Sequence, residues 1–154
     1  MRQTSRKKNK TVTARTRGIA VAKTLISKRK ILIVDDDPVV RDVFKIIFEK
    51  EGYEVDMKED GRELLKNNFR KPDLFLIDKL LSGVNGLDIC RHLKSQKSTQ
   101  HIPVVMISAS PGIANQSEQA GADDYIEKPF EREHLLHVVR KNLSIQRNEW
   151  RALS

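Results

Sequence analysis

The chain lacks features that define several classes of protein. Its single cysteine, Cys90, excludes an internal disulfide and favours a reducing compartment. No stretch approaches the roughly 20 apolar residues that a membrane-spanning helix needs. Residues 18–26 are too short and too interrupted for a secretory signal. We therefore expect a cytoplasmic protein without a transmembrane segment.

The first 30 residues contain no acid and no aromatic side chain. They hold eleven of the 29 Lys and Arg and none of the 21 Asp and Glu, so residues 31–154 hold 18 basic and 21 acidic residues. This composition predicts a basic, disordered N-terminal extension over residues 1–28. An arginine-rich, acid-free start is also typical of an organelle transit peptide. Contact of residues 1–30 with nucleic acid or anionic lipid would be non-specific, because no stacking aromatics or DNA-binding fold accompany the charge.

Four apolar runs each end at residues suited to phosphate chemistry. The runs and the polar residues that follow them are Ile31–Val34 before Asp35, Asp36 and Asp37; Leu74–Ile77 before Asp78; Val104–Ile107 before Ser108; and Tyr125–Ile126 just before Lys128. Strands of a parallel sheet covered on both faces are continuously apolar, and ligands bind at their carboxyl ends. The crowded carboxylates would repel one another unless a cation such as Mg²⁺, which prefers oxygen ligands, joined them. The pattern predicts a magnesium-dependent phosphoryl-transfer site.

Strand and helix patterns alternate along the chain. We expect strands over 30–35, 53–57, 74–78, 102–108 and 122–127. We expect helices from Pro38 to before Gly52, over 61–68, around 87–93, from Ser110-Pro111-Gly112 to Ala120, and from 131 to about 146. Five alternating pairs predict an α/β fold with a doubly wound parallel sheet and helices on both faces. One domain over residues 29–148, with a short C-terminal tail over 149–154, fits the length.

Several motifs together resemble a known family. They are Ile31–Pro38, Asp78 with Gly83 and Gly86 downstream, Ser108-Ala109, Ala120–Tyr125, and Lys128-Pro129-Phe130. Over roughly residues 29–147 the chain resembles the receiver domain of two-component response regulators, of the single-domain, chemotaxis-regulator-like kind. The resemblance implies a five-stranded flavodoxin-like sheet of order 2-1-3-4-5. It also implies phosphorelay signal transduction, in which a histidine kinase or histidine phosphotransfer protein donates a phosphoryl group to an aspartate.

The resemblance assigns the acceptor and its metal. Asp78 corresponds to the phosphoacceptor of the family. Asp35 and Asp36 correspond to the acidic pair that holds Mg²⁺ together with Asp78, and the backbone carbonyl of Leu80 corresponds to the remaining protein ligand.

The resemblance also assigns a phosphate-binding and switching group. Ser108 and Lys128 would contact oxygens of the phosphoryl group, and small Ala109 would leave the donor access. Ser108 and Tyr125 would form a conformational switch that reshapes the surface for a downstream protein. The protein would thus catalyse its own phosphorylation and slow dephosphorylation without being a conventional enzyme.

The chain departs from the family pattern after the acceptor. Many receivers have a Met-Pro pair and an Asp-Gly pair there, whereas this chain has Leu81-Ser82 and Asn85-Gly86. Without the proline we expect a looser loop and an unchanged set of metal ligands.

Two other functions fit part of the sequence. In a haloacid-dehalogenase-like phosphatase, Asp35 would be the nucleophile and Asp37 the acid, but Asp78 would then have no role. Asp37 is otherwise expected to cap the following helix. A phosphorylation-independent receiver-like interaction module would keep the fold without the chemistry. With no effector domain expected after residue 150, we expect a stand-alone receiver that acts through another protein and does not bind specific DNA.

Overall fold

A parallel five-stranded sheet forms the centre of the molecule. The computed structural model describes residues 27–153, apart from the side chains of residues 146, 149 and 150. The strands of the sheet are β1 (Lys30–Val34), β2 (Glu54–Lys58), β3 (Leu74–Asp78), β6 (Val104–Ser108) and β7 (Asp124–Glu127). They lie in the order β2-β1-β3-β6-β7, with every neighbouring pair parallel. Counted along the chain, this is the predicted flavodoxin-like order 2-1-3-4-5, which is confirmed.

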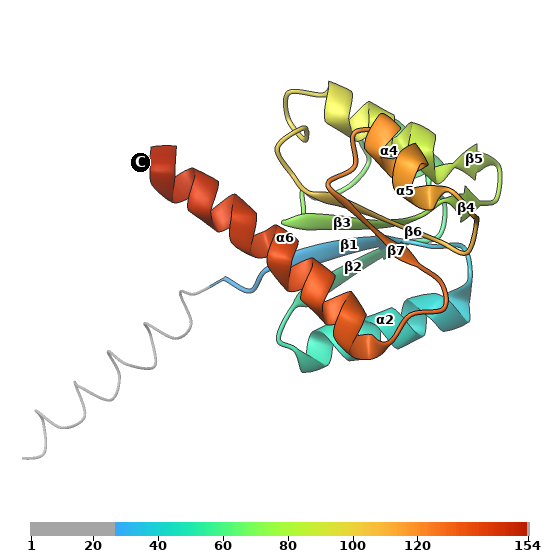
Figure 1. The fold of residues 1–154 in the computed structure, drawn as a ribbon, viewed down its shortest axis with the longest axis horizontal. Coiled ribbons are helices and arrows are strands. Elements are labelled where there is room, and N and C mark those ends of the chain that lie inside the picture. The colour runs from blue at the N-terminus through green and yellow to red at the C-terminus, as the bar shows by residue number, and fades with distance from the viewer. Residues whose placement is uncertain (1–26, 154) are drawn as a thin grey trace, which may run out of the picture.

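Helices cover both faces of this sheet, as predicted (Figure 1). On one face lie α2 (Pro38–Lys50) and α6 (Arg132–Leu153). On the other lie α3 (Arg62–Leu65), α4 (Gly86–Ser95) and α5 (Ile113–Gln119). Because successive strand residues point to opposite faces, β1 divides its side chains between two cores. Ile31 and Ile33 pack with residues of α2 and α6, whereas Leu32 and Val34 pack with residues of α3, α4 and α5.

Capping residues fix where the helices beside the strand ends begin. The Asp37 carboxylate accepts a hydrogen bond from the Val39 N–H at 2.9 Å, and Pro38 occupies the first turn of α2. The side chain of Asn85 accepts from the Leu87 N–H at 2.9 Å and caps α4. Each cap supplies an acceptor to otherwise unbonded N–H groups of a helix start. The predicted capping role of Asp37 is confirmed.

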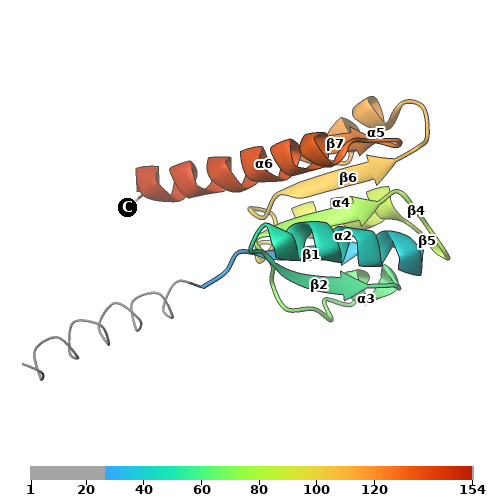
Figure 2. The ribbon, with the colours of Figure 1, turned by 90° about the horizontal axis from the view of Figure 1, so that it is seen from below.

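Three elements differ from the prediction. The expected loop after Asp78 contains a small antiparallel hairpin of β4 (Leu80–Leu81) and β5 (Val84–Asn85). Helix α3 ends at Leu65 because Asn67 adopts a left-handed backbone, with φ of 57°. Helix α6 continues through residues 149–153, which we expected to be a tail, since no glycine or proline follows Pro129 to stop it. Its C-terminal half projects beyond the sheet (Figure 2).

The expected extension over residues 1–28 lies outside the described residues, except for residues 27 and 28. The same holds for most of the segment 1–30 in which we expected non-specific contact with anionic partners. Within residues 27–153, no helix is long and apolar enough to cross a membrane.

Candidate active site

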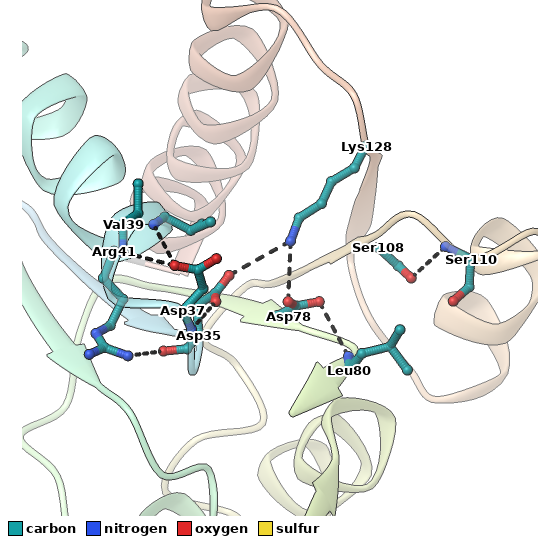
Figure 3. A network of polar contacts seen from close by, with 10 residues as sticks. Asp35, Asp37, Val39, Arg41, Asp78, Leu80, Ser108, Ser110 and Lys128 are labelled. Carbon is teal, nitrogen blue, oxygen red and sulfur yellow. Dashed lines mark hydrogen bonds and ion pairs between the residues drawn. The ribbon is translucent and has the colours of Figure 1, made fainter. Parts of the chain in front are cut away.

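The carboxyl ends of β1 and β3 bring two acids to one lysine. Asp35 follows β1 and is 2% exposed, while Asp78 ends β3 and is 9% exposed. The Lys128 Nζ lies 3.2 Å from Asp78 Oδ2 and 3.8 Å from Asp35 Oδ2 (Figure 3). A single ammonium group therefore contacts two nearly buried carboxylates that are 43 residues apart in sequence.

The backbone around Asp78 fixes the position of its carboxylate. Asp78 Oδ1 accepts a hydrogen bond from the Leu80 N–H at 3.2 Å, while Oδ2 faces Lys128. The start of α4 packs directly on this backbone, and the Gly86 N–H donates to the Lys79 carbonyl at 2.8 Å. A Cβ atom at Gly86 would collide with the carbonyl oxygen of Asp78. Glycine at this position is thus required for the close approach of α4 to the end of β3.

Ser108 lies at the end of the neighbouring strand β6 and is 1% exposed. Its Oγ accepts a hydrogen bond from the Ser110 N–H at 2.9 Å, so its hydroxyl proton remains available for donation. Its carbonyl accepts from the Lys128 N–H at 2.9 Å, which ties the backbones of the two predicted phosphate-binding residues together. Ala109, the predicted access residue, is exposed.

Tyr125 is placed apart from the carboxylates. It lies on β7, opposite Met106 of β6, and is 38% exposed. Its side chain lines a groove of about 660 Å³ between β7, the following loop and α6. The structure therefore places one predicted switch residue in the interior and the other at an exposed groove, on adjacent strands.

Burial is the largest influence on the pKa of Asp35. Burial raises the pKa of this carboxyl above its ordinary value, and the charges of Asp78 and Asp36 raise it further. The Asp37 N–H, which donates to Asp35 Oδ1 at 2.9 Å, and the Lys128 ammonium act in the opposite direction. Three carboxylates with one ammonium leave an excess of negative charge, which a bound cation would offset.

Asp36 is held at the rim of the site by the hairpin. Its Oδ2 accepts hydrogen bonds from the Ser82 N–H at 2.9 Å and the Ser82 hydroxyl at 2.6 Å. The hydroxyl bond is the main reason that the pKa of Asp36 lies below its ordinary value. Neither bond uses Oδ1.

The donor set fits Mg²⁺ that keeps part of its water shell. In the described part of the chain, no three His, Cys, Asp or Glu side chains form a group that could hold a metal ion by themselves. Mg²⁺ is usually bound through one or two carboxylates together with water and phosphate oxygens, and not by a cage made only of protein. Asp35, Asp36, Asp78 and the Leu80 carbonyl offer oxygen ligands alone, which suits such a partial site.

Two residues of the site were not among the predicted ones. Arg41 of α2 donates from Nη1 to the Asp35 backbone carbonyl at 2.6 Å, and its Nη2 lies 3.7 Å from Glu59. Ser82 contacts Asp36 as described above. Arg41 follows Asp37 by one helical turn, which gives only a weak signal in the sequence. Ser82 stands out in the sequence only as the place where the family often has proline.

Comparison with known families shows to which family the chain belongs. A family model of the response regulator receiver domain matches residues 31–140, a range that includes every predicted site residue. The chain belongs to the response regulator receiver family. Phosphorelay signalling in two-component systems, through an aspartyl phosphate and Mg²⁺, is general to receiver domains, which interact with histidine kinases and downstream effectors.

Full-length relatives of this receiver carry additional sequence. The chain is 37% identical over 133 residues to the alkaline phosphatase synthesis transcriptional regulatory protein SphR of Synechococcus elongatus, covering 78% of this chain and 51% of that protein. It is 36% identical over 125 residues to the DNA-binding response regulator MtrA of Mycolicibacterium smegmatis, covering 79% and 53%. The chain thus spans about half the length of these relatives.

Solved receiver structures share its fold. The CheY-like receiver domain protein of Methanospirillum hungatei is 35% identical, with a TM-score of 0.71 over 80% of this chain and 99% of that one. The receiver domain of a sensor histidine kinase from Pseudomonas aeruginosa is 26% identical, with a TM-score of 0.69 over 77% and 99%. The latter structure has a magnesium ion coordinated in its active-site cleft.

Proposed function

We propose that Asp78 accepts a phosphoryl group from a histidine kinase or a histidine phosphotransfer protein in a Mg²⁺-dependent reaction. The observation that carries this proposal is the nearly buried carboxylate of Asp78 at the end of β3, with the Lys128 ammonium at 3.2 Å and Asp35 beside it. Ligands of doubly wound sheets bind at the carboxyl ends of the strands, where the strand order changes direction. Here that point lies between β1 and β3.

The residues around Asp78 can supply what phosphoryl transfer requires. A carboxylate reacts poorly with an anionic phosphoryl group, so catalysis depends on positioning and on charge neutralisation. The Leu80 N–H and Lys128 orient the two oxygens of Asp78. One of these oxygens forms the new O–P bond while the P–N bond to the donor imidazole breaks. The imidazole nitrogen keeps the electron pair of that bond and takes up a proton.

Other groups of this chain would hold the product. Lys128 can form a charge-assisted hydrogen bond with a phosphoryl oxygen, which is stronger than a neutral one. The Ser108 hydroxyl, whose proton is not used by Ser110, can donate a second bond. Asp35, Asp36, Asp78 and the Leu80 carbonyl would hold Mg²⁺. When bound, the ion neutralises charge and orients the phosphoryl oxygens.

Movement of Ser108 would transmit the signal. If its hydroxyl shifts toward the phosphoryl group, the space it leaves can be taken by the Tyr125 ring, which now lies in the exposed groove beside α6. A local change of charge would thereby alter the surface around α5 and β7 for a downstream protein. Slow transfer of the phosphoryl group to water would reset the switch.

The haloacid-dehalogenase-like alternative has little support. Its expected acid, Asp37, caps α2, and among the described residues α6 follows β7 without a further strand that could carry additional acids.

Intact mass after incubation with acetyl phosphate tests the proposal. We expect a single base-labile phosphoryl adduct that requires Mg²⁺ and is absent in Asp78→Asn. The control Asp88→Asn changes an exposed acid of α4 that pairs with Arg91, and it should leave the adduct intact. An adduct that survives Asp78→Asn but is lost in Asp35→Asn would favour the phosphatase. No adduct in any variant would favour the interaction module.

A further inference from the structure

The hairpin after the acceptor makes a contact that proline could not make. Ser82 stands where many receivers have proline, and it donates both its N–H and its hydroxyl to Asp36 Oδ2. Proline has neither of these donors. The two bonds join the β4–β5 hairpin to the loop between β1 and α2, across 46 residues of sequence.

The turn itself does not require serine. Leu81 of β4 pairs with Val84 of β5, so Ser82 and Gly83 form a two-residue turn. Gly83 has a φ of 77°, and Ser82 is not among the residues with positive φ. Turns with positive φ at the third residue commonly carry proline at the second. The distinctive contribution of Ser82 is therefore its pair of bonds to Asp36 and not the shape of the turn.

Within the described residues, Ser82 provides the only hydrogen bonds from another part of the chain to the Asp36 carboxylate. An ionised carboxylate has two oxygens and about four acceptor sites. With Oδ2 occupied by Ser82, the orientation of the carboxylate is fixed and Oδ1 is left for another partner. Carboxylates that ligate metals are commonly held in this way by neighbouring donors.

We propose that Ser82 is a positioning residue for the Mg²⁺ site. Ser82 holds one carboxylate oxygen of Asp36, so that the other oxygen is oriented toward the ion. This inference rests on the proposed function, because it takes Asp36 as a ligand. It differs from the family pattern, in which the hairpin often lacks both donors, and it assigns Ser82 a part in setting the Mg²⁺ affinity of this chain.

Calorimetric titration of the unphosphorylated protein with Mg²⁺ tests the role of Ser82 directly. We expect the Kd to rise about threefold in Ser82→Ala, which keeps the N–H, and about tenfold in Ser82→Pro, near the lower end of the roughly 10–100-fold losses seen for such partners. Ser82→Thr, which keeps both donors, should bind Mg²⁺ with the Kd of the wild type. The control Ser95→Ala removes a hydroxyl that donates to the His92 carbonyl on α4, and it should bind Mg²⁺ like the wild type.

A double variant separates positioning from a general effect on the hairpin. In an Asp36→Asn background, Ser82→Ala should cause no further change in Mg²⁺ affinity, because coupled residues are not additive. Thermal unfolding without Mg²⁺ should show that Ser82→Ala still unfolds cooperatively, with only the small loss of stability expected for one exposed hydrogen bond. A persistent effect in the Asp36→Asn background, an unchanged Kd, or tighter binding in Ser82→Ala would each overturn the inference.

Phosphorylation at saturating Mg²⁺ distinguishes this inference from the proposed function. All Ser82 variants should form the Asp78 adduct with acetyl phosphate when Mg²⁺ is in excess. An adduct in the wild type, combined with equal Kd values across the variants, would reject the role of Ser82 alone. A wild type that neither binds Mg²⁺ nor forms the adduct would reject both proposals.

Discussion

At the scale of single residues, Asp35 links the stability of the fold to pH. Its raised pKa means that the folded chain binds this proton more tightly than the unfolded chain does. Between the ordinary value of 3.8 and the raised value, the contribution of Asp35 to stability therefore falls as pH rises. Above that window the ionised carboxylate destabilises the fold unless a cation is bound.

Replacement of Asp35 should therefore stabilise the protein in the absence of Mg²⁺. We expect Asp35→Asn, whose amide oxygen can still accept from the Asp37 N–H, to raise the free energy of unfolding at pH 7. The gain should disappear below the ordinary pKa, where the wild-type carboxyl is neutral in both states. Urea unfolding across this pH range measures the effect. Asp88→Asn, at an exposed position, should show no such gain, and a destabilised Asp35→Asn at pH 7 would contradict the argument.

Gly86 offers a second test at this scale. A Cβ atom in Gly86→Ala would press on the backbone of Asp78, so we expect a loss of about 1–3 kcal/mol of stability, as for other overpacked sites. Phosphorylation by acetyl phosphate should also slow, since the acceptor is displaced. The control Gly52→Ala, with φ of 86° and no nearby atoms, should lose about 1–2 kcal/mol from backbone strain and react normally. An unchanged reaction rate in Gly86→Ala would show that the acceptor tolerates the shift.

At the scale of elements, α6 divides into a packed half and a projecting half. Among its described side chains, the buried ones are Leu135, Leu136, Val138, Val139, Asn142 and Leu143. Beyond them, Ile145 is 47% exposed and Leu153 is 90% exposed. The described side chains of the last turns are therefore not part of the core of the domain.

Truncation and core substitution in α6 should destabilise the protein by very different amounts. Ending the chain after Ser144 should lower stability by less than about 1 kcal/mol, because the side chains that the structure describes in residues 145–153 are exposed. Leu143→Ala, in contrast, should destabilise by about 2–5 kcal/mol, as expected for a buried leucine. Urea unfolding compares the two variants. If the truncation were as damaging as Leu143→Ala, the projecting half would have to contribute packing of its own.

The elements that sequence could predict are those with long, uniform signals. Strands β1, β3 and β6 were predictable because each is a buried apolar run, whereas the partly polar strands β2 and β7 carry a weaker signal. The convergence of the strands on Asp35, Asp78 and Lys128 followed from parallel strands ending at one edge. The β4–β5 hairpin was missed because two-residue strands have no periodicity. The end of α6 was misplaced because its apolar pattern stops before the helix does. The contacts of Arg41 and Ser82 depend on the paths of individual side chains, which spacing does not encode.

At the scale of the whole molecule, charge is distributed unevenly. Residues 31–154 have a formal net charge of −3, from 18 basic and 21 acidic residues, whereas the whole chain has +8. The acidic crevice therefore lies within a segment, residues 31–154, that is itself mildly acidic. Any strong attraction to polyanions is expected to come from residues 1–30.

Deletion of residues 1–28 tests this division. These residues hold nine of the 29 Lys and Arg and none of the 21 acids, so the deletion takes the net charge from +8 to −1. We expect the full chain to bind duplex DNA of arbitrary sequence with an affinity that falls steeply with salt. The logarithm of the binding constant should fall with the logarithm of the salt concentration, with a slope of about −0.9 per phosphate neutralised. The deletion variant should lose this binding while it still forms the Asp78 adduct with acetyl phosphate.

Fluorescence anisotropy with labelled DNA, over a series of salt concentrations, measures both the affinity and the slope. Binding that persists in the deletion variant, or that depends on the DNA sequence, would mean that residues 29–154 contain a nucleic-acid surface of their own.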